Sequence, residues 1–279
     1  EFLGLDEKVE VKINKLVPTF DIDNTYAHKL KQGRIRFLSI CKDLVLFNFD
    51  RIKERKLVHN GAKDPYDTFE LIKQIGVKNK ETKLFWLVGE RSNYDKNISI
   101  SNKEHQALIS SISEKVEVNL HPSYNSNSDI QNIENEKISI EEVIGRKVVR
   151  SRQHFLRFEL PKTYNTLVAA GFQHEYSMGF AEHVGFRSGT ARPHHWFDLI
   201  NDRTTDFQIH PFAYMDGTLN EYMQLSIEES KVKIQQLYNE VCQYGGDFVF
   251  IWHNETIGDY KKWKGWSEVL HFTLNLKNE

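Results

Sequence analysis

Short apolar runs alternate with longer amphipathic segments along almost the whole chain, and this pattern allows few folds. We expect strands at the apolar runs, at residues 16–22, 83–89, 115–120, 148–153, 175–178, 185–187, 207–214 and 247–253. We expect helices between them, at residues 34–47, 68–75, 102–114, 140–147, 160–170 and 226–244, with a last one from residue 264. An amide-rich loop is expected at residues 125–135.

This alternation predicts an α/β fold built on a parallel sheet. No linker rich in proline, glycine or serine divides the chain, so residues 1–279 are expected to form a single domain. With about six to eight strand–helix units, a distorted or incomplete (β/α) barrel fits better than an open doubly wound sheet.

The composition argues against several classes of partner. The formal net charge is −2, which gives no electrostatic case for a nucleic acid or an anionic membrane. No apolar run approaches the roughly 20 residues that a membrane span needs. Neither a G-x-G-x-x-G nor a Walker-type loop follows an expected strand, so nucleotide binding is not indicated. Cys41 and Cys242 lie in helical patterns and are expected to be buried free thiols.

Ionisable side chains gather at or just after the C-terminal ends of the expected strands. They are Asp21, Asp23, His121, His154, Arg187, Asp216 and His253. In a barrel these strand ends meet on one face, so residues far apart in sequence can share one pocket. A single residue of this kind is most often a helix cap or a solvated loop residue. Seven ionisable residues that all lie at strand ends predict a functional site.

The order of these residues resembles the motif pattern of the polysaccharide deacetylase, or NodB-homology, family of carbohydrate esterases. Thr19-Phe20-Asp21-Ile22-Asp23 is similar to a D-x-D variant of the family's first motif, and His121-Pro122-Ser123-Tyr124-Asn125 is half of the second, H-[ST]-x-x-H. Phe186-Arg187, Met215-Asp216-Gly217 and Trp252-His253 are similar to the third, fourth and fifth. The resemblance spans residues 16 to 253 in the right order.

The resemblance implies a metal-dependent hydrolase that removes N-acetyl groups from a polysaccharide or a glycan precursor. It makes Asp23 and His121 ligands of a divalent metal, with zinc as the expected ion. Asp21 becomes the general base that takes a proton from water, and His253 the general acid.

Two further residues support the acid and the base in this scheme. Arg187 is expected to pair with Asp21, because a nearby cation favours the ionised form of a carboxylate. Asp216 is expected to hold His253 in the required tautomer and to favour its protonated form.

The third metal ligand departs from the family pattern. Four residues after His121, where the pattern has histidine, this chain has Asn125, whose amide oxygen is a poor zinc ligand beside imidazole. We expect His154, at the end of the next strand, to complete the ligand set. Two alternatives are that Asn125 serves as a weak or water-mediated ligand, and that the site binds metal poorly and the protein is inactive.

The expected partner is a carbohydrate, with no nucleic acid and no membrane span. Tyr26 and Tyr124, each three residues after a proposed ligand, are expected to contact the sugar together with Arg192. Two other functions remain open: hydrolysis of a small non-sugar amide at the same site, and an inactive glycan-binding module. The resemblance is to a divergent bacterial branch, so residues 1–279 are expected to be a catalytic domain, either alone or at the C-terminus of a longer protein, in the cytoplasm or cell envelope.

Overall fold

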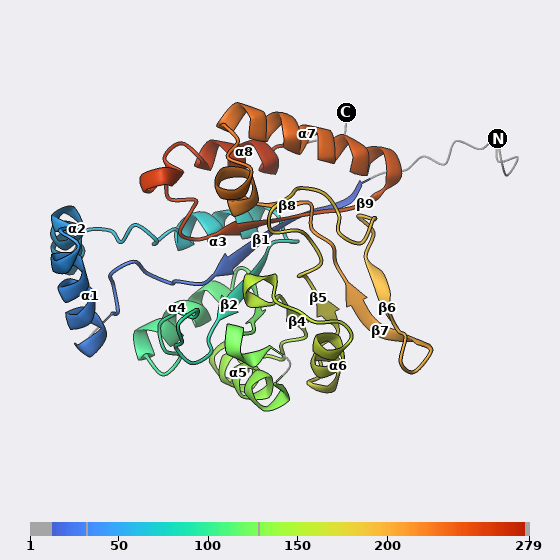
Figure 1. The fold of residues 1–279 in the computed structure, drawn as a ribbon, viewed down its shortest axis with the longest axis horizontal. Coiled ribbons are helices and arrows are strands. Elements are labelled where there is room, and N and C mark those ends of the chain that lie inside the picture. The colour runs from blue at the N-terminus through green and yellow to red at the C-terminus, as the bar shows by residue number, and fades with distance from the viewer. Residues whose placement is uncertain (1–12, 32, 128, 277–279) are drawn as a thin grey trace, which may run out of the picture.

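A curled, mainly parallel sheet forms the centre of the molecule (Figure 1). The computed structural model describes residues 13–31, 33–127 and 129–276. Its strands are β1 (Ile13–Ile22), β2 (Lys83–Leu87), β3 (Glu117–His121), β4 (Arg150–Ser151), β5 (His174–Glu175), β6 (His194–Asp198), β7 (Arg203–Ile209), β8 (Tyr214–Met215) and β9 (Gly246–His253). They form one nine-stranded sheet in the order β6-β7-β5-β4-β3-β2-β1-β9-β8, in which only the β6–β7 pairing is antiparallel. The predicted incomplete (β/α) barrel is confirmed as a half-barrel.

The chain also forms α-helices, most of which cover the outside of the curled sheet. They are α1 (Gly33–Val45), α2 (Phe49–His59), α3 (Phe69–Lys78), α4 (Lys103–Ser113), α5 (Ile130–Ile144), α6 (Lys162–Ala169), α7 (Ile227–Tyr244) and α8 (Ser267–Leu274). In the view of Figure 1, α7 and α8 lie above the sheet, while α4, α5 and α6 lie below it. Within the described ranges, no helix combines the length and the apolar character needed to cross a membrane.

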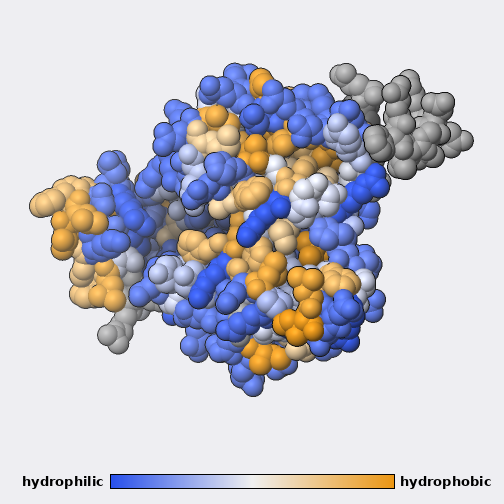
Figure 2. Space-filling model, turned by 45° about the vertical axis from the view of Figure 1, so that its right-hand side comes forward, coloured by the Kyte–Doolittle hydropathy of each residue, from blue (hydrophilic) through white to orange (hydrophobic). Residues whose placement is uncertain are grey.

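The α1–α2 hairpin stands away from the sheet at the left of Figure 1. In the space-filling view, apolar surface gathers at this end of the molecule (Figure 2). Cys41 of α1 and Cys242 of α7 are free thiols, as predicted, but both are partly exposed where burial was expected.

Residue alternation along the central strands divides the apolar side chains between two faces of the sheet. Phe20 of β1 and Trp252 of β9 point outward into the main core beneath the helices. The inner face holds a smaller cluster of Val17, Phe85, Tyr176, Phe212, Val249 and Ile251. Asp21 and His253 are register partners on β1 and β9 and continue this inner face at its C-terminal edge. The strand period therefore brings two ionisable groups side by side above an apolar floor.

Helix α7 shows how strongly local sequence can specify an element. Ser226 and Glu229 form a reciprocal capping box at its start, which satisfies two backbone N–H groups. At its end, Gly245 adopts a φ of 79°, a conformation that favours glycine. These signals place both helix ends within one residue of the prediction.

Several elements differ from the prediction where tertiary contacts outweigh local composition. Helix α5 occupies most of the expected amide-rich loop, because Ile133 and Ile140 are buried and Asp129 caps its first turn. The expected strand at 207–214 is divided, since Pro211 cannot donate a backbone hydrogen bond. The expected strand at 185–187 is a turn region, and α2 and β6 were not predicted.

Candidate metal and catalytic site

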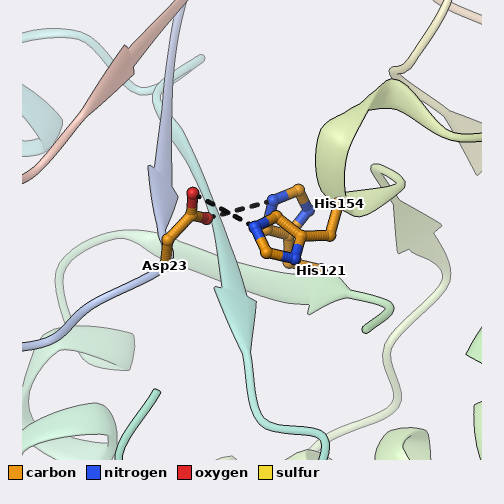
Figure 3. Close-up of side chains that lie close together, drawn as sticks. All are labelled: Asp23, His121 and His154. Atoms are coloured by element: carbon orange, nitrogen blue, oxygen red, sulfur yellow. Dashed lines mark ion pairs between the residues drawn. The ribbon is translucent and has the colours of Figure 1, made fainter. Parts of the chain in front are cut away.

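Asp23, His121 and His154 bring their side chains together at the C-terminal edge of the sheet (Figure 3). Asp23 follows β1, His121 ends β3, and His154 lies in a short helical turn after β4. The Asp23 Oδ1 lies 3.2 Å from His121 Nε2, and the Asp23 Oδ2 lies 3.4 Å from His154 Nε2. One ligand atom from each residue lies within 4.8 Å of the others. These separations suit one cation bonded to each atom at about 2 Å.

A hydrogen bond at Nδ1 orients each imidazole so that its Nε2 faces Asp23. The Nδ1 of His121 lies 2.5 Å from the Arg152 carbonyl oxygen, which can only accept, so this nitrogen carries the proton. The Nδ1 of His154 lies 2.8 Å from Oδ1 of the buried Asp95. Each Nε2 lone pair is thereby left facing Asp23, in the arrangement that metal-binding histidines adopt. A carboxylate with two imidazoles fits zinc well.

The electrostatics of this group favour a bound positive charge. Burial by itself raises the pKa of Asp23, but the charge of His154 and hydrogen bonds from both histidines hold it well below the usual value. Burial lowers the pKa of His154, yet Asp23 and Asp95 outweigh that effect and raise it to about 9. A proton and a metal ion therefore compete for Nε2 of His154.

The cation that pairs with Asp21 is Arg152. Its Nη1 lies 2.7 Å from Asp21 Oδ1, and its guanidinium is fully buried, with its central carbon 4.4 Å from the centroid of the Phe85 ring. The expected partner, Arg187, lies instead over the Phe158 ring at 4.7 Å. This corrects the expected Arg187–Asp21 pair.

A sequence signal for Arg152 exists. It stands two residues before His154, near the C-terminal end of the expected strand 148–153, as the other ionisable residues of the site stand at the ends of theirs.

His253 and Asp216 form a hydrogen-bonded pair beside the metal-binding group. His253 Nδ1 lies 2.8 Å from Asp216 Oδ1, and the His253 backbone N–H donates to Asp216 Oδ2 at 2.8 Å. The Thr256 hydroxyl donates to the same Oδ2 at 2.5 Å. Burial lowers the pKa of His253, but Asp216 and then Asp23 raise it well above the usual value. The imidazole is thus held in its proton-donating form, with its Nε2 3.9 Å from Asp23 Oδ2.

These groups line a cleft of about 730 Å³. Its lining includes Asp21, Asp23, His121, His154, Asp216 and His253. Aromatic side chains also line it, namely Tyr66, Tyr94, Phe155, Tyr222, Tyr260 and Trp263. The cleft therefore combines one cluster of ionisable groups with a lining of aromatic side chains.

The two predicted sugar-contacting tyrosines do not line this cleft. Tyr26 is buried and packs edge-on against Phe69, with the ring centroids 5.8 Å apart. Tyr124 stacks on Tyr94 with a centroid separation of 4.0 Å, and Tyr94 is the one that lines the cleft. The sequence offered no signal that would separate these rings.

Two other predicted residues also lie apart from the group. Arg192 donates to the Tyr244 carbonyl oxygen at 2.9 Å, near the start of β9 and therefore at the opposite end of that strand from His253. Asn125, the alternative third ligand, is exposed in the short helical turn 124–126. His154 is the side chain beside Asp23 and His121; its role as a ligand stays a prediction.

No protein-family model matches the chain, and a search of curated proteins finds no match. Solved structures do match. A protein from Mycobacterium smegmatis, provisionally named a polysaccharide deacetylase, superposes with a TM-score of 0.55 at 14% identity, over 98% of this chain and 87% of its own. One from Pseudomonas aeruginosa PAO1, provisionally named in the same way, gives a TM-score of 0.54 at 9% identity, over 95% and 84%. The chain therefore has the fold of proteins named polysaccharide deacetylases, as the resemblance in its sequence predicts.

Proposed function

We propose that this protein is a metal-dependent hydrolase that removes N-acetyl groups from a glycan. One observation carries the proposal: a cleft in this fold brings Asp23, His121 and His154 together with two pairs of oppositely charged side chains. The pairs are Asp21–Arg152 and His253–Asp216. Metal-assisted amide hydrolysis uses a Lewis acid, a base and an acid within one site.

Asp23, His121 and His154 would hold a divalent cation, with zinc the best fit to these donors. Such a cation polarises an amide carbonyl and makes water more acidic. Asp21 Oδ1 is engaged by Arg152, so Oδ2 is the oxygen that accepts a proton from the attacking water. Since Asp21 and His253 are register partners, they can flank one reacting group.

His253 supplies the proton that the leaving amine requires. Asp216 binds its Nδ1, so Nε2 is the donor that faces the cleft. As the C–N bond breaks, the Nε2 proton passes to the sugar nitrogen and acetate is released. Asp216 stabilises the charged imidazole before that transfer.

The cleft also offers groups that would bind the sugar. Tyr94, Phe155 and Tyr260 line the cleft, and aromatic rings of this kind suit carbohydrate rings. Gln153 lines the cleft at 1% exposure, and neither its amide nitrogen nor its amide oxygen has a hydrogen-bond partner within the described part of the chain. A buried, unpaired amide of this kind is expected to bind a hydroxyl or acetamido group of the substrate.

Acetate release tests the proposal. The protein, loaded with zinc, is incubated with N-acetylated oligosaccharides and, in parallel, with small non-sugar amides. We expect release from the sugars, loss of activity with a chelator and recovery with zinc. Release from the small amides alone would favour the alternative amidase function.

The Asp21→Asn variant separates catalysis from binding. We expect it to keep its zinc and to lose turnover by about a hundredfold or more, because a neutral amide cannot act as the base. Turnover at the parent rate would contradict the assigned base. If the parent protein binds zinc and glycan but releases no acetate from any of them, it is an inactive glycan-binding module.

A further inference from the structure

The α1–α2 hairpin exposes large apolar side chains over both helices and the turn between them. We call this set the apolar hairpin surface; it consists of Phe37, Leu38, Leu44, Val45, Leu46, Phe47, Phe49 and Leu57. Every one of these side chains is at least half exposed, and Phe47 reaches 77%. In Figure 2 the surface appears as the apolar group at the left edge. Contiguous apolar patches of this kind mark contact sites for proteins or membranes.

The interior of the hairpin is polar, which is the reverse of an ordinary helix pair. Asp43 of α1 and Arg55 of α2 form an ion pair at 2.6 Å, with side chains only 3% and 7% exposed. Arg51 adds a second contact to Asp43 at 3.8 Å. Polar groups thus join the two helices, while most of the large apolar side chains described in the hairpin are exposed. This arrangement is expected where the surroundings of the hairpin are themselves apolar.

The hairpin segment is also strongly basic. Residues 29–63 contain ten Lys or Arg and three Asp or Glu, a net charge of +7. Because the whole chain carries −2, the other residues carry −9. The near-neutral net charge of the whole chain therefore conceals a cationic segment. This segment, unlike the chain as a whole, is expected to be attracted to an anionic membrane.

We propose that the α1–α2 hairpin docks the protein on an anionic lipid bilayer. The turn at residues 44–49 would enter the boundary between head groups and acyl chains, and the surrounding basic side chains would contact lipid phosphates. The acyl chains of such a bilayer match the apolar hairpin surface, and its negative charge matches the basic residues of the same segment. A second copy of the chain fits less well, since two segments of charge +7 repel each other.

Docking through this hairpin would place the cleft next to the lipid head groups. Arg51 of α2 lines the cleft. Glu54 of α2 accepts from the Tyr260 hydroxyl at 2.6 Å and lies 3.0 Å from His28 Nε2. Helix α2 is therefore part of the cleft wall. Binding of the hairpin to a bilayer requires no particular reaction in the cleft.

Vesicle flotation tests the proposal with the whole chain. The probes are vesicles of phosphatidylcholine alone and of phosphatidylcholine mixed with phosphatidylglycerol. We expect binding to the anionic vesicles that weakens as salt is added, and little binding to the neutral ones. Failure to bind anionic vesicles better than neutral ones would overturn the proposal.

Two surface variants test the two parts of the interaction. Phe47→Ser with Phe49→Ser removes apolar contact at the turn and is expected to reduce vesicle affinity at least tenfold. Lys53→Gln with Lys56→Gln, both exposed on α2, is expected to reduce it about 30-fold, because each basic residue near the surface contributes about a factor of five.

Matched controls carry the same chemical changes elsewhere on the surface. Leu199→Ser with Ile200→Ser alters side chains that are 83% and 68% exposed at the β6–β7 turn. Lys115→Gln with Lys147→Gln removes two exposed charges before β3 and β4. Both controls should bind like the parent, and equal losses in the controls would overturn the proposal. A parent dimer that the Phe47→Ser/Phe49→Ser variant converts to monomer would also overturn it, because a second copy would then cover the surface.

Discussion

Arg152 contacts both the apolar side chains beneath the cleft and the proposed catalytic and metal-binding groups. Its guanidinium lies over Phe85, its Nε donates to the Tyr176 carbonyl oxygen at 3.0 Å, and its Nη1 binds Asp21. Its own carbonyl oxygen accepts from His121. One residue therefore orients both the proposed base and a proposed metal ligand.

Replacing Arg152 with methionine should damage stability and turnover together. The variant leaves the Asp21 carboxylate buried without its cation, at a cost of about 3 kcal/mol or more in the free energy of unfolding. We expect acetate release to fall by about a hundredfold. Urea unfolding and kcat measure the two effects. Arg187→Ala is the control, since Arg187 contacts Phe158, and a large loss of kcat in that variant would contradict the assigned pair.

His154 and Asn125 can be distinguished by zinc binding. His154→Ala should lower zinc affinity by about a hundredfold or more, because it removes one of the three donor atoms. Asn125→Ala should bind zinc like the parent, since this side chain is exposed. Competition with a chromophoric chelator measures both affinities. An unchanged affinity in His154→Ala would remove that residue from the ligand set.

At the scale of elements, α4 is joined to β2 by a buried polar contact. Trp86 of β2 donates through Nε1 to His105 Nε2 at 3.1 Å, and the Thr25 hydroxyl lies 2.9 Å from the same nitrogen. His105 is fully buried, which lowers its pKa to about 4. The ring must stay neutral because its Nε2 is already an acceptor.

This contact predicts a loss of stability in acid. Below pH 6.5 the unfolded chain protonates His105, whereas the folded protein does not until about pH 4. Stability is therefore lost as the pH falls through that window, by up to about 3 kcal/mol from this residue. Urea unfolding of His105→Gln at several pH values should give a flatter dependence. His59→Gln, at an exposed position, should keep the slope of the parent, and an equal slope in both variants would refute the prediction.

At the scale of the whole molecule, the proposed metal site joins three separate parts of the sheet. Asp23 follows β1, His121 ends β3 and His154 follows β4, so a cation held by them would link three strand ends. Both cysteines are free thiols, so no disulfide links these strands, and the described residues hold no second cluster of three or more His, Cys, Asp or Glu side chains that could bind a metal. Metal binding is therefore expected to stabilise the fold as well as to serve catalysis.

Removal of metal should lower the melting temperature. Zinc at about 100 times its Kd stabilises a native protein by about 2.7 kcal/mol, which corresponds to a rise of about 5 °C or more in Tm for a chain of this size. Calorimetry with a chelator, and then with excess zinc, measures the shift. Asp23→Ala should show no zinc-dependent shift, and an undiminished shift in that variant would locate the metal elsewhere.

The sequence predicted those features that depend on local periodicity. The alternation of strands and helices, the ends of α7, and the placement of Asp21, Asp23 and His253 at strand ends all follow from patterns a few residues long. Such patterns act through backbone geometry, which neighbouring residues determine. A resemblance in motif order then sufficed to predict the fold.

Only the tertiary structure decided which side chains meet. Arg152, rather than Arg187, reaches Asp21 across 131 positions of sequence, and Tyr26 turns into the core while Tyr94 lines the cleft. The tertiary structure likewise pairs Asp43 with Arg55 between α1 and α2 and leaves large apolar side chains of both helices exposed. These outcomes depend on how distant elements pack and on which buried charges find partners, and no local pattern contains that information.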